Sequence, residues 1–255
     1  MTTSNTGRFV WHELHTTDRP KAQKFYATLI GWETKEVPMG PGEPYTLCLL
    51  EGKDHAGITK SMAPAHVPPH WLPYIAVDSV DKSAAKVKEL GGKVMMEPMD
   101  IPNVGRFAAV ADPQGAAFAL FTSVKDYPAE PERPPVSAFC WEELATSDPE
   151  AAAKFYAALF GYTVEEVPMG PMGTYRILKS GERQRAGITK FPPGAPPHPA
   201  WLEYIAVKDV DGSTRNAREL GAKTMMEPTD IPNIGRFSII ADPQGAAIAL
   251  FKGAP

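Results

Sequence analysis

The chain has 255 residues, a net charge of −4 and an isoelectric point near 5.9. No run of Lys and Arg is long enough to follow a phosphate backbone, so we expect no nucleic-acid partner. The N-terminal residues contain no apolar export core, and no stretch of about 18 apolar residues occurs, so we expect no membrane association and a cytoplasmic location.

A long internal repeat organises the sequence: residues 8–122 return as residues 138–252, at a constant offset of 130 positions and without a gap. We therefore predict two tandem domains, 8–122 and 138–252, joined by the polar, Pro-rich linker 123–137. Each domain is about 115 residues long, which is enough to bury a core of its own. Positions kept in both copies serve both halves, and positions that differ serve one half at most.

Cysteine usage agrees with a reducing compartment. Cys48 and Cys140 lie at non-equivalent points of the repeat, where the other copy has Leu178 and Val10. A disulfide common to the repeat is therefore excluded.

The first half divides into two similar series of elements. An alternating segment predicts a strand over Phe9–Leu14, and Asp18 and Gly31 predict the two ends of a helix over Arg19–Ile30. Further strands are predicted around Trp32–Val37, Tyr45–Leu50 and Ala56–Thr59. The second series comprises a strand at Leu72–Val77, a helix at Val80–Leu90, and strands near Lys93–Met96, Arg106–Ala111 and Ala116–Phe121. The predicted fold class is α+β, with two βαβββ units in each half and four in the chain.

Three motifs resemble those of the vicinal oxygen chelate superfamily, which includes glyoxalase I, extradiol dioxygenases and bleomycin-resistance proteins. They are Trp11-x-Glu13-Leu14-x-Thr16-x-Asp18, Phe25-Tyr26-x-x-Leu29-x-Gly31 and Asp112-Pro113-x-Gly115. More narrowly, the chain is similar to a tandem subgroup usually labelled glyoxalase/bleomycin-resistance-like or "hydroxylase". The resemblance covers all four units and implies curved mixed sheets that enclose a cup. It does not by itself imply an activity.

The resemblance also implies positions for metal ligands, and here they carry no donor atoms. The positions correspond to Trp11, Leu72 and Ala119 in the first half, and to Trp141, Leu202 and Ala249 in the second. Indole, isobutyl and methyl groups do not bind a divalent cation. We therefore expect neither a metal site nor a cofactor.

One alternative metal site stays open in the first half. Strand alternation places Trp11, Glu13 and His15 on one face, inside the cup, and His12 on the other face with Leu14. Glu13 and His15 are a conceivable half-site for a metal ion. The second copy offers only Glu143 and Ala145, and a single pair of ligands rarely makes a site.

Glu13 and Glu143 are the polar residues that both cups share. A carboxylate on such a face requires a partner or water. One interpretation makes it a catalytic base or an anchor for a ligand. The other makes it a structural salt bridge, to Arg106 and Arg236 respectively.

Aromatic residues kept in both copies complete the predicted ligand sites. The predicted ligand-binding residues are Trp11, His15, Tyr45, Tyr74 and Arg106 in the first half, and Trp141, Tyr175, Tyr204 and Arg236 in the second. Such residues suit a flat, mostly apolar molecule with one polar group, although large apolar side chains are also ordinary core content.

Three functions are compatible with this pattern. We favour metal-independent binding of a small hydrophobic or aromatic molecule, as in sequestration of a toxic metabolite or antibiotic, by a monomer or homodimer. The alternative is a glyoxalase-like, lyase or hydroxylase-type enzyme with Glu13 or Glu143 as base, or with a metal at Glu13 and His15. A structural or signalling protein with vestigial pockets leaves the paired glutamates unexplained.

Overall fold

The computed structural model describes residues 5–39, 43–62, 64, 66–170, 173–191 and 198–254. The elements of the first half are β1 (Phe9–Thr16), α1 (Arg19–Ile30), β2 (Glu33–Val37), β3 (Tyr45–Leu50), β4 (Lys53–Lys60), β5 (His70–Ala76), α2 (Val80–Glu89), β6 (Lys93–Ile101), β7 (Gly105–Ala111) and β8 (Ala117–Ser123).

The second half repeats this order. Its elements are β9 (Phe139–Thr146), α3 (Pro149–Phe160), β10 (Thr163–Pro168), β11 (Thr174–Ser180), β12 (Arg183–Lys190), β13 (Ala200–Ala206), α4 (Val210–Glu219), β14 (Lys223–Ile231), β15 (Gly235–Ala241) and β16 (Ala247–Gly253). The predicted α+β fold class, with four βαβββ units, is confirmed.

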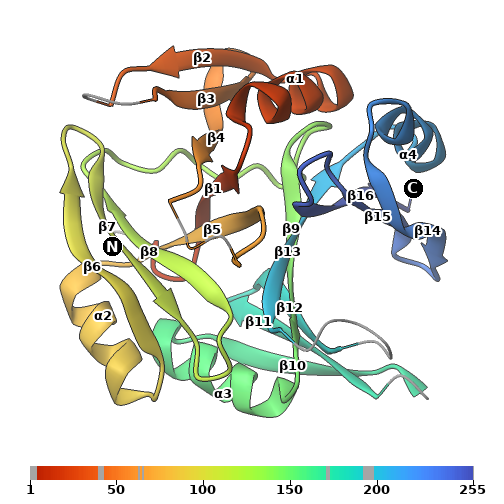
Figure 1. Ribbon diagram of the computed structural model, residues 1–255. Coiled ribbons are helices and arrows are strands. Elements are labelled where there is room, and N and C mark those ends of the chain that lie inside the picture. The colour runs from red at the N-terminus through yellow and green to blue at the C-terminus, as the bar shows by residue number, and fades with distance from the viewer. Residues whose placement is uncertain are drawn as a thin grey trace. The chain divides into compact units, whose positions relative to one another are not determined.

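Each half forms one eight-stranded sheet (Figure 1). The strand order is β2-β3-β4-β1-β5-β8-β7-β6 in the first half and β10-β11-β12-β9-β13-β16-β15-β14 in the second. The inner pairs β1–β4 and β5–β8 are parallel, whereas the hairpin strands outside them are antiparallel. The first strand of each βαβββ unit therefore lies inside the sheet, and its two faces are distinct.

The helix ends are set by the residues that the sequence singled out. The side chain of Asp18 accepts a hydrogen bond from the backbone N–H of Lys21 at 3.1 Å, and Gly31 ends α1 in the left-handed conformation with φ of 87°. Asp148 and Gly161 do the same for α3. An N-cap of this kind contributes about 1 kcal/mol. Within the described ranges, no helix has the length and apolar character needed to cross a membrane.

Some strands are longer than the sequence pattern predicts. β4 begins at Lys53 instead of Ala56, because a two-residue turn at Glu51 and Gly52 pairs Leu50 directly with Lys53. Both turn residues have positive φ, 52° and 73°. This combination is the type I′ turn, whose twist matches that of the two strands it joins.

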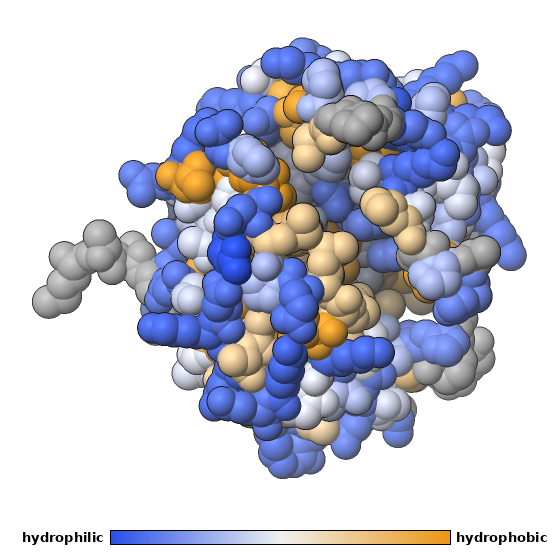
Figure 2. Space-filling view, turned by 60° about the vertical axis from the view of Figure 1, so that its left-hand side comes forward, coloured by the Kyte–Doolittle hydropathy of each residue, from blue (hydrophilic) through white to orange (hydrophobic). Residues whose placement is uncertain are grey.

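β6 also extends further than predicted, to Ile101 instead of Met96, and it lies at the edge of its sheet. Met95, Met96 and Met99 on this strand are about half exposed, at 50%, 46% and 47%. Irregular pairing with β7 and the proline at position 98 interrupt the ladder. Such interruptions protect an edge strand from pairing with another chain. The face in Figure 2 carries apolar residues, in pale and full orange, across its centre, with hydrophilic side chains around them.

Residue packing divides the chain into two compact units that each draw on both halves. Unit 1 comprises residues 1–10, 73–130 and 141–201, and unit 2 comprises residues 11–72, 131–140 and 202–255. Their hydrophobic cores follow the same division, with α2 and α3 in unit 1 and α1 and α4 in unit 2. The expectation that each half buries a core of its own is therefore wrong. The boundaries 8–122, 123–137 and 138–252 stay a prediction.

A buried tyrosine–aspartate hydrogen bond joins the two halves within each unit. In unit 2 the hydroxyl of Tyr26 donates to Oδ2 of Asp242 at 3.2 Å, and Trp71 Nε1 donates to the same tyrosine at 3.0 Å. In unit 1 Tyr156 donates to Oδ2 of Asp112 at 3.3 Å. The other oxygen of each aspartate accepts backbone N–H groups of its own Asp-Pro-x-Gly turn. One carboxylate thus fixes both a turn and the helix of the other half.

Two equivalent core positions carry histidines in unit 2 and other ionisable residues in unit 1. In unit 2, His12 is buried and its ring stacks on Phe139 with centroids 3.8 Å apart, and His55 stacks on the same ring. The burial of His12 confirms its predicted orientation. Burial lowers the pKa of His12 to about 3. The equivalents in unit 1 are Glu142 and Arg185, and burial raises the pKa of Glu142 to about 8.

Ionisation of Glu142 should destabilise the folded chain as the pH rises. Its carboxyl has a pKa of about 8 in the folded chain against 4.5 in the unfolded chain, so ionisation favours unfolding. The free energy of unfolding should fall between those two pH values, by up to about 1.4 kcal/mol per pH unit. Glu142→Gln should remove this slope. Urea unfolding across the pH range measures it, and an unchanged slope would contradict the assignment.

The matched control is His12→Phe, because the same core position in unit 2 has the opposite dependence. Protonation of His12 favours unfolding below its ordinary pKa of 6.5 and down to about 3. The variant should therefore flatten the acidic side of the profile and leave the slope that Glu142 causes in place.

Candidate functional site

A chain of hydrogen bonds connects three of the predicted site residues in the first half. Trp11 Nε1 donates to the hydroxyl of Tyr45 at 3.0 Å, and this hydroxyl donates to Oε2 of Glu13 at 2.7 Å. Trp11 and Glu13 alternate on β1 with the fully buried Leu14, which belongs to the core beneath α1. The two residues therefore lie on the sheet face opposite the helix, as the alternation predicts.

The second half contains the same arrangement. Trp141 Nε1 donates to the hydroxyl of Tyr175 at 3.0 Å, and Tyr175 donates to Oε2 of Glu143 at 2.8 Å. Burial and then the carboxylate of Glu143 raise the pKa of Tyr175 far above its ordinary value. The phenol therefore stays protonated and acts as a donor. We call each set of three residues a Trp–Tyr–Glu relay.

A glycine in the neighbouring strand makes room for each tyrosine. A Cβ atom at Gly57 would lie 1.7 Å from Tyr45 Oη, and one at Gly187 would lie 1.8 Å from Tyr175 Oη. Gly57 pairs with Glu13 across the parallel strands β4 and β1, which brings the hydroxyl to the carboxylate. Our sequence reasoning missed both glycines. A strand-interior glycine at the same place in both copies was the available signal.

Gly57→Ala should displace Tyr45 and leave the carboxylate of Glu13 without that donor. Loss of a hydrogen bond to a charged group costs about 1.5–3 kcal/mol, so we expect a decrease of that order in the free energy of urea unfolding. In a Tyr45→Ala background the added methyl group meets no ring, and the same substitution should cost much less. Equal costs in the two backgrounds would contradict this role of Gly57.

Two histidines extend the relay in the first half only. His15 Nε2 lies 3.0 Å from Oε1 of Glu13, and the rings of His15 and His70 are parallel within 4° at a centroid distance of 5.2 Å. His70 Nδ1 lies 2.9 Å from the carbonyl oxygen of Pro68. Burial lowers the pKa of His70, and the Pro68 carbonyl partly opposes the shift.

His70 was not among the predicted site residues. The equivalents of His15 and His70 in the second half are Ala145 and Ala200. The two histidines are thus replaced together, and this joint change was the signal for a contact between them.

The positions that the resemblance assigns to metal ligands do not fit a metal ion. Leu72, Ala119 and Ala249 are buried at 6%, 0% and 0% exposure, and their side chains carry no donor atom. The parallel rings of His15 and His70 direct their in-plane lone pairs along parallel planes, so these do not converge on one point. The described residues contain no group of three or more His, Cys, Asp or Glu side chains that could hold a metal.

Tyr74 and Tyr204 belong to aromatic clusters on the sheet face opposite α2 and α4. Tyr74 stacks on Phe107 with centroids 6.1 Å apart and meets the edge of Phe121 at 6.0 Å. Tyr204 repeats the cluster with Phe237 and Phe251. In each half the tyrosine and the relay belong to different compact units. A ligand contact of Tyr74 or Tyr204 therefore stays a prediction.

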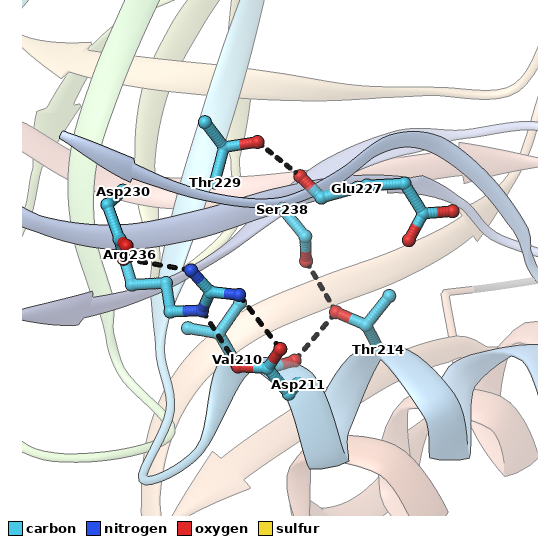
Figure 3. A network of polar contacts seen from close by, with 8 residues as sticks. All are labelled: Val210, Asp211, Thr214, Glu227, Thr229, Asp230, Arg236 and Ser238. Carbon is cyan, nitrogen blue, oxygen red and sulfur yellow. Dashed lines mark hydrogen bonds and ion pairs between the residues drawn. The ribbon is translucent and has the colours of Figure 1, made fainter.

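Arg106 and Arg236 bind surface carboxylates. In Figure 3, the guanidinium of Arg236 donates two hydrogen bonds to Asp211, at 2.8 and 2.9 Å, and a third to Asp230 at 2.9 Å. Arg106 binds Asp81 and Asp100 with the same geometry. Both arginines thus clamp the first turn of a helix to an edge strand. The alternative that they form the salt bridges of Glu13 and Glu143 is not supported, and their ligand contacts stay a prediction.

Comparisons with known proteins identify the family and the fold. The family model of the Glyoxalase/Bleomycin resistance protein/Dioxygenase superfamily matches residues 8–120 and 139–250. The Mycobacterium tuberculosis protein named "Putative glyoxylase CFP32" is 39% identical over 96% of this chain and 94% of its own length. The "Anthracycline biosynthesis protein DnrV" of Streptomyces peucetius is 33% identical over 99% of this chain and 95% of its own.

Solved structures with little sequence identity share the fold. The Mn(II)-bound glyoxalase from Novosphingobium aromaticivorans is 18% identical, with a TM-score of 0.67 and coverage of 98% of this chain and 83% of that one. An extradiol ring-cleaving dioxygenase from B. fuscum is 16% identical, with a TM-score of 0.70 and coverage of 99% of this chain and 73% of that one. At this identity the comparison establishes the fold alone.

Proposed function

Since the chain belongs to the Glyoxalase/Bleomycin resistance protein/Dioxygenase superfamily, we propose that it binds a small, flat, largely apolar molecule with a hydroxyl group, without a metal ion. The proposed contacts are the indole rings of Trp11 and Trp141 and the carboxylates of Glu13 and Glu143. Such binding suits the sequestration of a toxic metabolite or an antibiotic.

The observation that carries this proposal is the Trp–Tyr–Glu relay, which is built twice with nearly the same distances. Each indole N–H is bonded to a tyrosine, so the ring offers the ligand an apolar π-face. Each tyrosine hydrogen is bonded to a glutamate, whose ionised carboxyl group can accept about four hydrogen bonds in all. A flat ring with a donor hydroxyl complements these two neighbouring features.

The name of one relative supports the same ligand class. DnrV is named for anthracycline biosynthesis, and anthracyclines are fused-ring aromatic compounds with phenolic hydroxyl groups. The relay residues are half-buried, so a ligand can reach them without unfolding of the strands. The proposed site therefore suits the class of compound for which this relative is named.

Calorimetric titration with 3-nitrophenol and nitrobenzene tests the proposal, because the two probes differ only in the hydroxyl group. We expect the wild-type chain to bind 3-nitrophenol more tightly. Glu13→Gln/Glu143→Gln should weaken 3-nitrophenol binding by about 10- to 150-fold, the equivalent of a lost charged hydrogen bond, and leave nitrobenzene binding nearly unchanged. Equal wild-type affinities for the two probes would contradict the proposal.

Glu150→Gln is the matched control for the glutamate variants. Glu150 is an exposed carboxylate at the start of α3 that pairs with Lys154. The same change of charge at this position should leave both titrations as in the wild type. If it weakens 3-nitrophenol binding as much as the relay variants do, the effect comes from net charge and not from the relay.

An enzyme is the second candidate, favoured by the relative named as a glyoxylase. A glyoxalase-like, lyase or hydroxylase-type reaction would use Glu13 or Glu143 as base, or a metal ion at Glu13 and His15. In the first half Glu13 already accepts the Tyr45 hydroxyl hydrogen and lies beside His15. The hydrogen bond from Tyr45 favours a fixed acceptor, because it holds one oxygen of the carboxylate in place.

Removal of metal ions separates the two candidates. We expect dialysis against EDTA to leave 3-nitrophenol binding unchanged, because no metal ion takes part in the proposed contacts. Elemental analysis of the purified chain should find no stoichiometric Fe, Zn, Ni or Mn. Such a metal, present in the wild type and lost in Glu13→Ala, would overturn metal-independent binding and support the enzyme.

A further inference from the structure

Three arginines of unit 1 surround a single carboxylate of the linker. Glu130 Oε1 lies 2.6 Å from Nη1 of Arg185 and 3.2 Å from Nε of Arg8. The other oxygen, Oε2, lies 3.8 Å from Nη1 of Arg183. We propose that the three arginines form a binding site for a phosphate group, and that Glu130 competes with the phosphate for them. The site is separate from the proposed function, because none of its residues belongs to a Trp–Tyr–Glu relay.

A β-bulge helps to bring the arginines together. The pairing of β12 with β11 shifts between Gln184 and Ala186, so Arg185 has no residue opposite it. A bulge of this kind aims a side chain in a direction that regular strand alternation does not give. Arg183 opens the same strand, and Arg8 directly precedes β1. The guanidinium groups thus come from both halves of the chain and meet within one compact unit.

The cluster carries more positive than negative charge. Glu130 supplies one negative charge against three guanidinium groups. The carboxyl group of Glu142 interacts with Arg185, but burial raises its pKa to about 8, so it is mostly protonated at neutral pH. Burial also lowers the pKa of Arg8, and the charges of Arg185 and Arg183 add to this shift while Glu130 opposes it. A second negative charge would therefore stabilise the arginines as a group.

Two N–H donors of the cluster also have no acceptor. Nε of Arg8 and Nε of Arg185 are buried, and neither makes a hydrogen bond within the described residues; the approach of Arg8 to Glu130 is an ion pair without hydrogen-bond alignment. A carboxylate has two oxygens, whereas a phosphate group on an ester has three acceptor oxygens and a charge of about −2. The planar guanidinium fork matches phosphate geometry. Both the excess charge and the unused donors therefore favour phosphate over Glu130.

Solvent reaches the cluster from one side. The side chain of Arg183 is 47% exposed and that of Glu130 is 24% exposed, so a phosphate group can approach them and exchange with the linker carboxylate. Unit 2 has no equivalent cluster, because its residues at the three arginine positions are Ala138, Lys53 and His55. The proposed phosphate site is therefore confined to unit 1.

Calorimetric titration with inorganic phosphate and with phenyl phosphate tests the inference, at low ionic strength so that salt does not screen the charges. Glu130→Gln should tighten the binding of both probes by about tenfold, because it removes the competing carboxylate. Arg185→Gln should weaken binding by about 10- to 150-fold, the equivalent of a lost charged hydrogen bond. Arg183→Gln should weaken it by about two- to fivefold, as expected for a more exposed pair, and it keeps the test valid if Arg185→Gln does not fold.

Glu132→Gln and Arg133→Gln are the matched controls, because they make the same changes of charge at exposed residues of the linker. Both should titrate as the wild type does. A lack of saturable phosphate binding in Glu130→Gln would overturn the site, and so would an equal tightening in Glu132→Gln. Binding of both probes with the same dependence on the variants would assign the site to the phosphate group itself, and binding of phenyl phosphate alone would assign it to a phosphate ester.

Discussion

The buried hydrogen bond between a helix tyrosine and the aspartate of a distant turn is the constraint on which this fold depends. Asp112 and Asp242 each close a turn with one oxygen and bind a tyrosine of the other half with the second. Burial raises the pKa of both carboxyls, although the backbone donors oppose the shift. A buried polar group keeps its place only while these partners remain, so each bond specifies which helix packs in which unit.

How much the sequence predicted depends on the range of the interactions involved. The strand at Phe9–Leu14, the helix at Arg19–Ile30 and the face of Glu13 follow from alternation, caps and the repeat, all of which act over a few residues. The space that Gly57 leaves for Tyr45 depends on which strands pair. The contact between His15 and His70 and the partners of Arg106 also come from residues far apart in the sequence, so no local pattern indicated them.

Two core positions that are equivalent under the repeat are occupied by residues of different chemistry in the two units. His12 and His55 surround Phe139 as neutral aromatic rings. Glu142 and Arg185 instead place a carboxyl group and a guanidinium group at these positions, and Arg185 binds Glu130 of the linker at 2.6 Å. Arg8 reaches the same carboxylate at 3.2 Å. The Glu130 end of the linker is therefore anchored in unit 1, because this glutamate binds two arginines there.

The sharing of each core between the two halves has a consequence for how the duplicated sequence can diverge. A residue in the first half packs against residues from the second half within its unit, and seldom against its own repeat equivalent. A substitution in one copy must therefore fit the residues of the opposite copy that it contacts, as between the two subunits of an obligate heterodimer. The histidine pair of the first relay could be lost or gained without disturbing either core, and a duplicated chain can in this way assign separate tasks to its two copies while it folds as one.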